Sequence, residues 1–137
     1  LAGWRGVVGM VALAVAAIGA TLGGLFAMDP VGTPMDQAST SAQLHNLGFM
    51  LGGPGTLLAI TFVNWALARS PTCNGARGML AATAAFAWAA MVVFFIAVSM
   101  LMGDPQGGDM LIGVWNRVLV VSWVVWVVAL VLRVRRA

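Results

Sequence analysis

Four long runs without charge, separated by short polar stretches, dominate the pattern of this chain. Three of them, residues 6–28, 47–68 and 78–103, contain no charged residue, and the fourth, 110–132, is interrupted only by Arg117. An α-helix rises about 1.5 Å per residue, so about 20 apolar residues cross a hydrocarbon core roughly 30 Å thick. The pattern predicts four transmembrane helices, at about 4–28, 41–67, 78–102 and 111–133.

The composition agrees with this prediction, because 61% of the 137 residues are hydrophobic and only 8% are charged. Such a balance is typical of membrane proteins. We therefore expect an all-α integral membrane four-helix bundle that forms a single transmembrane domain over 1–137. The net charge of +3 does not indicate a nucleic-acid partner, because the arginines are spread over the helix ends and form no basic stripe.

The charges predict the orientation of the helices. Six of the seven basic residues lie at the two ends of the chain or in the connection between the second and third helices, and all four aspartates lie in the other two loops. Arginine marks the cytoplasmic side, so both termini are expected in the cytoplasm. The lack of Lys, Glu and Tyr beside abundant Ala, Gly, Val and Arg suggests a bacterial chain, and hence the bacterial inner (cytoplasmic) membrane.

Small residues recur on two of the predicted helices. Small residues four positions apart let a neighbouring backbone approach closely, so they predict helix-packing faces. The first helix carries Ala12, Ala16, Gly19, Ala20 and Gly23, and the third carries Ala81, Ala85 and Ala89.

The middle of the second helix reads Leu-Gly-Gly-Pro-Gly-Thr. Pro54 removes one backbone donor, and Gly52, Gly53 and Gly55 weaken the same turn, so a kink or a short unwound stretch is expected there. Such a helix break serves packing in some proteins and forms a midplane binding site in transporters. Both interpretations remain open.

The loop that begins at Met28 contains signals for turns and for a helix start. Asp-Pro-Val-Gly at 29–32 and Asp-Pro-Gln-Gly at 104–107 both fit a type I turn. Thr40 followed by Gln43 is the pattern of a capping box at the start of the second helix. Much of this polar loop is thus expected to serve turns and caps.

Arg117 lies inside the fourth hydrophobic run, where a charge must reach the surface or meet a partner. We predict that it joins Asp29, His45, Asn46 and Asp104 in an outward-facing polar cluster. Two interpretations remain open: the cluster binds an anionic group such as a lipid phosphate through the guanidinium, or it is a hydrogen-bonded structural contact between helices.

The residue types exclude several chemistries. A single histidine with no nearby cysteine cannot supply the ligands of a catalytic zinc ion, and bis-histidine haem would need a second histidine. Ser99 and Ser122 lie inside helices without a visible base and are expected to bond back to the helix backbone. We therefore expect no catalytic residue, no metal site, no cofactor and no enzymatic activity.

At these residues the chain resembles the bacterial membrane proteins catalogued as domain of unknown function 998. The similarity rests on the motifs LFAMDPVG, QLHNL, GVWNR and WVVALVLR, and places Asp29, Pro30, His45, Arg117, Trp126 and Arg133 at matching positions. The chain departs from the family pattern at two places. Asn116 stands where a glutamine is typical, and the glycine-rich stretch around Pro54 is not part of the usual pattern. The resemblance implies a bundle of about six spans, of which this chain supplies the last four, and it implies no particular activity.

Two functions of different class remain. The chain is expected to be an accessory or scaffold subunit of a larger membrane complex, in contact with lipids and with other transmembrane helices or subunits. The alternative is a lipid-binding or small-solute transport protein that uses the outward-facing Asp/His/Arg site.

Overall fold

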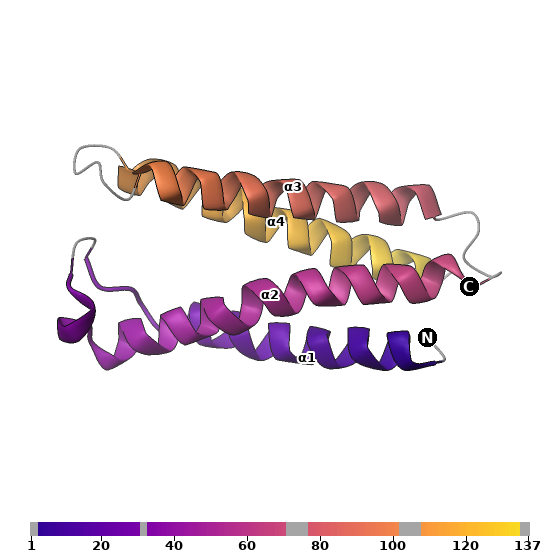
Figure 1. Ribbon diagram of the computed structural model, residues 1–137, viewed down its shortest axis with the longest axis horizontal. Helices are drawn as coiled ribbons and strands as arrows, with labels where there is room; N and C mark the ends of the chain where they lie inside the picture. The colour runs from indigo at the N-terminus through magenta and orange to yellow at the C-terminus, as the bar shows by residue number, and fades with distance from the viewer. Residues whose placement is uncertain (1–2, 31–32, 71–76, 102–107, 135–137) are drawn as a thin grey trace. The chain divides into compact units, whose positions relative to one another are not determined.

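The computed structural model describes residues 3–30, 33–70, 77–101 and 108–134 of the chain. In these ranges the protein is all-α, with four long helices and one short 3-10 helix (Figure 1). The elements are α1 (Trp4–Leu25), η1 (Met35–Gln37), α2 (Thr40–Ala68), α3 (Arg77–Leu101) and α4 (Gly108–Val134). Each long helix is long and apolar enough to cross a membrane, so the predicted fold class is confirmed.

The chain divides into two compact units, residues 1–66 and 67–137. In the first unit α1 and α2 run antiparallel (Figure 1). The buried positions of α1 are all glycine or alanine and recur every three or four residues, as a single helix face requires. They are Gly6, Gly9, Ala12, Ala16 and Gly19.

Glycines bring the backbones of α1 and α2 into direct contact. A Cβ atom built on Gly19 would collide with the backbone nitrogen of Gly52 and would lie 2.6 Å from the carbonyl oxygen of Gly48. One built on Gly48 would lie 2.5 Å from the nitrogen of Gly23. Such close approach is how membrane helices gain packing energy without a hydrophobic drive between them. The predicted small-residue face of α1 is confirmed at Ala12, Ala16 and Gly19, which are buried, whereas Ala20 is exposed.

Of the two outcomes expected at Gly52–Gly55, a kink or a short unwound stretch, the unwound stretch is not present. The α2 helix is continuous from Thr40 to Ala68 with Pro54 inside it, and therefore contains no unwound stretch. Gly52, Gly53 and Gly55 are buried while Pro54 is exposed. A Cβ on Gly55 would lie 3.0 Å from the nitrogen of Ala16, so this glycine serves the contact with α1. Membrane helices tolerate an internal proline because it removes only one backbone hydrogen bond.

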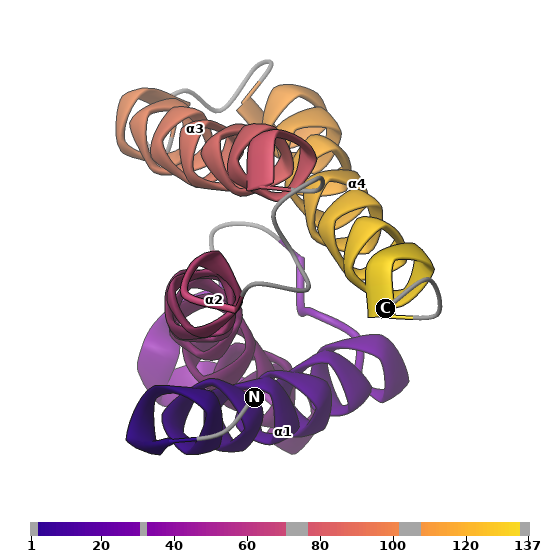
Figure 2. The ribbon, with the colours of Figure 1, turned by 90° about the vertical axis from the view of Figure 1, so that its right-hand side faces the viewer.

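In the second unit α3 packs against α4, as the end-on view in Figure 2 shows. The buried residues of each helix lie on one of its faces. They are Leu80, Ala87, Ala90, Met91, Phe94 and Ala97 on α3, and Leu119, Ser122, Trp126 and Ala129 on α4. The prediction that Ala81, Ala85 and Ala89 form a packing face inside the bundle was wrong, since all three are exposed. The buried face of α3 is formed by a different set of residues, in which three alanines alternate with Leu80, Met91 and Phe94.

Candidate functional site

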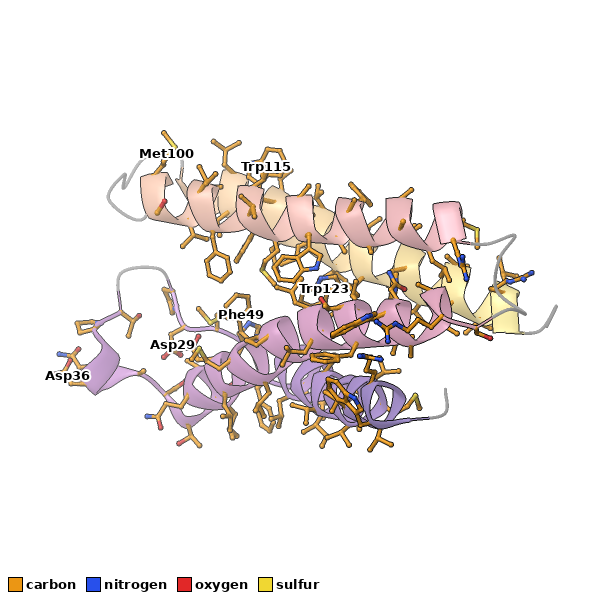
Figure 3. All side chains as sticks on the ribbon, turned by 45° about the vertical axis from the view of Figure 1, so that its right-hand side comes forward. Asp29, Asp36, Phe49, Met100, Trp115 and Trp123 are labelled. Atoms are coloured by element: carbon orange, nitrogen blue, oxygen red, sulfur yellow. The ribbon has the colours of Figure 1, made fainter. Side chains whose placement is uncertain are left out.

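The polar residues around the start of α2 bind the segment that leaves α1. Phe26 ends α1 in an extended conformation, with φ −108° and ψ 135°. Three side chains at or just before the first turns of α2 reach back to this segment: His45 to Phe26, Ser41 to Ala27, and Ser39 to Asp29. We call these six residues the α1–α2 junction. Figure 3 shows Asp29 in the segment between the two helices.

Ser41 satisfies both backbone groups of Ala27. Its hydroxyl donates to the carbonyl oxygen of Ala27 at 2.9 Å, and its oxygen accepts the N–H of Ala27 at 3.0 Å. Backbone groups beyond the end of a helix have no intrahelical partner, and in an apolar setting each unsatisfied group is costly. One serine therefore replaces the partners that Ala27 would find in a longer helix.

The carboxylate of Asp29 binds Ser39 through both of its oxygens. Oδ2 accepts the backbone N–H of Ser39 and Oδ1 accepts its hydroxyl, each at 2.7 Å. These bonds favour the charged form, so the pKa of Asp29 is lowered, chiefly by the backbone N–H of Ser39 and next by its hydroxyl. The carboxylate also lies near the amino end of α2, where the helix dipole favours negative charge.

Ser39 also caps α2, because its Oγ accepts the N–H of Ala42 at 3.1 Å. This is the bond of an N-cap residue to the third residue of the helix. The capping box expected at Thr40 and Gln43 is therefore not formed, and the N-cap is Ser39, one residue earlier. The side chain of Gln43 donates instead to the carbonyl oxygen of Ala38 at 3.0 Å, outside the reciprocal pattern that the motif requires.

His45 contacts the carbonyl oxygen of Phe26 through Nδ1 at 2.8 Å. A carbonyl oxygen only accepts hydrogen bonds, so Nδ1 must carry a hydrogen. In the neutral ring this leaves Nε2 as an acceptor. The imidazole is partly buried and joins the second turn of α2 to the end of α1. Its principal contact is thus structural.

The other predicted members of the polar cluster have different settings. Asn46 follows His45 on α2 and is partly buried. Arg117 is exposed on α4, and its Nη1 lies 3.4 Å from where a Cβ of Gly113 would be. The guanidinium therefore points back along α4 toward the start of the helix, over a residue without a side chain. This is the direction in which helical side chains lean.

The structure brings Asp29 and His45 to one junction, but through Ser39 and Phe26 respectively. Asn46 belongs to the same unit, Arg117 belongs to the other unit, and Asp104 lies outside the described residues. The polar cluster that would unite all five therefore stays a prediction.

The turn predicted at Asp29-Pro30-Val31-Gly32 lies partly outside the described residues, as does the whole of its counterpart at 104–107. The backbone bond present here runs from the N–H of Thr33 to the carbonyl oxygen of Pro30 at 3.2 Å. Among the described residues no three His, Cys, Asp or Glu side chains are grouped so that they could hold a metal ion. Ser99 and Ser122 donate to the carbonyl oxygens of Ile96 and Leu119, as expected.

Ser39 and Ser41 were missed by the sequence analysis. A serine within three residues of a helix start is a common N-cap, and the sequence Ser-Thr-Ser at 39–41 offers three candidates. The capping-box pattern selects Thr40 because of Gln43. Asp29 lies ten residues before the cap that it binds. The local sequence does not predict this contact, because the course of the loop between the two residues determines it.

These features define an all-α protein with four helices of membrane-spanning length and a hydrogen-bonded junction between the first two. Comparison of sequences gives the family: the profile described as "Protein of unknown function (DUF998)" matches residues 1–133. The chain belongs to this family, as its motifs indicate. No curated protein and no solved structure gives a significant match.

Two family positions on α4 have clear structural roles. Trp126 is completely buried, and Arg133 lies in the last turn of the helix, where the helix dipole favours positive charge. Gly113 and Arg117 form the Gly-x-x-x-Arg motif, and the guanidinium of Arg117 lies over Gly113.

Proposed function

We propose that this protein is a non-catalytic accessory or scaffold subunit of a larger membrane complex. The observation that carries the proposal is an exposed face of α3 that is opposite its buried face. Its residues follow one another at intervals of four and three. They are Gly78, Ala82, Ala85, Ala89, Val92 and Ile96, and we call them the α3 stripe.

The spacing and the residue types of the α3 stripe favour a helix as its partner. An alternation of four and three gives the 3.5-residue repeat with which two helices keep one seam in contact. Small residues at one end of the seam permit close backbone approach. The same chemistry joins Gly19 to Gly52 within the first unit. The proposed occupant is a transmembrane helix of another protein.

The settings of the polar side chains also support a non-catalytic role. Asp29 and His45 are engaged in the α1–α2 junction, and Ser122 bonds to its own helix. A nucleophile or general base needs a side chain that can exchange protons with a substrate. Asp29 and His45 are instead used here to connect α1 and α2. For the compartment we propose the bacterial inner membrane, with both termini in the cytoplasm.

Cross-linking along α3 tests the proposed subunit role. The single cysteine of the chain, Cys73, would first be replaced by serine. Single cysteines at Ala85 and at Ala87 would then be compared in native membranes. Ala85 lies on the α3 stripe, whereas Ala87 is completely buried. We expect a discrete cross-link to one other protein from Ala85→Cys and none from Ala87→Cys. The absence of any protein adduct from both positions would contradict the proposal.

A bulky substitution gives a matched second test. Ala85→Phe would block close approach on the α3 stripe, while Ala17→Phe makes the same change at an exposed position of α1. We expect Ala85→Phe to lower the amount of co-purified partner without changing the melting temperature of the isolated chain. Equal recovery from both variants would count against the α3 stripe.

Arg117 supports a second candidate function, lipid binding or small-solute transport at the predicted outer site. Its guanidinium lies over Gly113, and its fork of N–H donors suits a phosphate or carboxylate. A lipid that co-purifies with the wild-type chain and is lost on Arg117→Leu would favour this function over the subunit role.

A further inference from the structure

A cluster of aromatic rings surrounds Arg5 where the start of α1 meets the end of α2. The guanidinium carbon of Arg5 lies 4.2 Å from the ring centroid of Trp65 and 5.0 Å from that of Trp4. Both distances are within the range of cation–π attraction. Arg5 is thus held by the faces of two indole rings and is not extended freely into solvent.

The rings also fix one another. The centroid of Trp4 is 5.9 Å from that of Phe62 and 6.0 Å from that of Trp65, with interplanar angles of 61° and 77°. Edge-to-face pairs at these separations are favourable. Phe62 and Trp65 are 6.0 Å apart. We call Trp4, Arg5, Phe62 and Trp65 the Arg5 cluster; all four belong to the first compact unit.

The charge of Arg5 lacks compensation in the described part of the chain. Its Nε is buried and has no hydrogen-bond partner there, and the first turn of α1 contains no acidic residue. Aromatic faces attract a guanidinium but do not accept its in-plane N–H groups. Stacking on Trp65 therefore does not satisfy the in-plane N–H groups of the guanidinium, which suit the oxygens of an anion.

We propose that the Arg5 cluster binds a phosphate group. The planar fork of arginine matches two phosphate oxygens, and such charge-assisted pairs are among the stronger hydrogen bonds. Tryptophan side chains at the ends of membrane-spanning helices lie at the level of the lipid headgroups. Trp4 and Trp65 are 58% and 40% exposed, so a headgroup can reach them. The phosphate of an anionic phospholipid is the source that this position favours, and free phosphate shares its chemistry.

This site is distinct from the outward-facing polar cluster. Trp4 is the first residue of α1, whereas Asp29 follows the end of that helix, so the two sites lie at opposite ends of α1. The inference does not depend on the proposed subunit function, because a scaffold and a transporter could each hold a lipid here.

The test is a binding titration of the purified chain in detergent. Phosphatidylglycerol binding would be followed by native mass spectrometry, and inorganic phosphate binding at constant ionic strength by phosphorus NMR. We expect Arg5→Gln to weaken binding of phosphatidylglycerol about tenfold, the effect of losing hydrogen bonds to a charged group. Arg77→Gln, which removes the same charge from an exposed position at the start of α3, should change binding less than twofold.

A second variant keeps the test independent of folding. Arg5→Lys retains the charge but loses the planar fork, and should bind phosphatidylglycerol with an affinity between those of wild type and Arg5→Gln. Loss of lipid binding alone identifies a phospholipid site, and parallel loss of inorganic phosphate identifies a site for free phosphate. Equal binding of both probes by wild type, Arg5→Gln and Arg5→Lys would overturn the proposal.

Discussion

The carboxylate of Asp29 holds Ser39 by its backbone N–H and its hydroxyl at once, both at 2.7 Å. Ser39 in turn caps α2 through the N–H of Ala42. An acidic residue beyond the end of one helix thereby stabilises the beginning of the next. With the contacts of Ser41 and His45, this arrangement gives the polar loop of an otherwise apolar chain a structural purpose.

Asp29→Asn should lower the melting temperature of the detergent-solubilised chain. The asparagine side chain keeps one acceptor oxygen but loses the negative charge. Its NH2 group cannot accept the second hydrogen bond that Ser39 donates. Asp36→Asn is the matched control, since Asp36 is exposed on η1 (Figure 3) and should melt as wild type does. Identical melting of the two variants would show that the carboxylate of Asp29 does not stabilise the α1–α2 junction.

The lowered pKa of Asp29 predicts a loss of stability in acid. The hydrogen bonds from Ser39 place the pKa below the ordinary value of 3.8, so the unfolded chain binds a proton more readily than the folded chain. The stabilisation is complete above the ordinary pKa and is lost as the pH falls through the lowered value. Melting curves between about pH 5 and pH 2 should therefore decline less steeply for Asp29→Asn than for wild type. Parallel pH profiles would contradict this.

Ser39→Ala should destabilise the protein by about 1 kcal/mol, the usual effect of losing an N-cap. Thr40→Ala, at the neighbouring position that the capping-box motif selects, should have a smaller effect because Ser39 provides the cap. Chemical or thermal unfolding of the two variants under the same conditions measures the difference. A larger loss from Thr40→Ala than from Ser39→Ala would show that Thr40, and not Ser39, caps α2.

Gly19→Ala should disrupt the contact between α1 and α2. The added methyl group would meet the backbone of Gly52, which cannot move aside as a side chain can. Overpacking of this kind costs about 1–3 kcal/mol. Gly24→Ala is the control: it lies on the same helix with nothing within 4 Å of the added atom. It should be neutral or slightly stabilising, since alanine favours helix over glycine.

Arg117→Leu should lower thermal stability in detergent if the predicted cluster is structural. Arg117→Lys retains a charge that can extend toward the start of α4 and should recover part of the loss. Unchanged melting of Arg117→Leu together with loss of a bound lipid would instead support the lipid-binding alternative.

Much of the helical architecture could be predicted because length and hydrophobicity determine it. The charge-free runs gave four helices, and the first of them begins at Trp4 as expected. Its end was placed near residue 28, but α1 stops at Leu25. Phe26, Ala27 and Met28 are all apolar, so hydropathy alone cannot distinguish a last helical turn from an extended segment.

Packing faces were harder to predict, because several small-residue patterns compete on one helix. On α1 the buried pattern includes Gly19, but on α3 the pattern with Ala85 is exposed. The glycines around Pro54 suggested a break because glycine weakens isolated helices. Their actual role depends on α1, which supplies the backbone that fits against them. A tertiary contact of this kind is not visible in the local sequence.

Residue type singled out Asp29 and His45 as candidates, and the structure places both at the α1–α2 junction. Their partners there, Ser39 and Phe26, were not foreseen. The missing information is the course of the loop, which decides which serine meets the carboxylate. The partner of His45 is a backbone carbonyl, which every residue has, so residue type cannot predict this contact.

The mass of the intact assembly extracted from native membranes tests the central claim most directly. Native mass spectrometry of the tagged wild-type chain in mild detergent should give a complex that exceeds the chain by one or more stoichiometric protein subunits. Ala85→Phe should release the chain from this complex, whereas Ala17→Phe should not. A chain that emerges without any other protein, carrying only a lipid that is lost on Arg117→Leu, would contradict the subunit role.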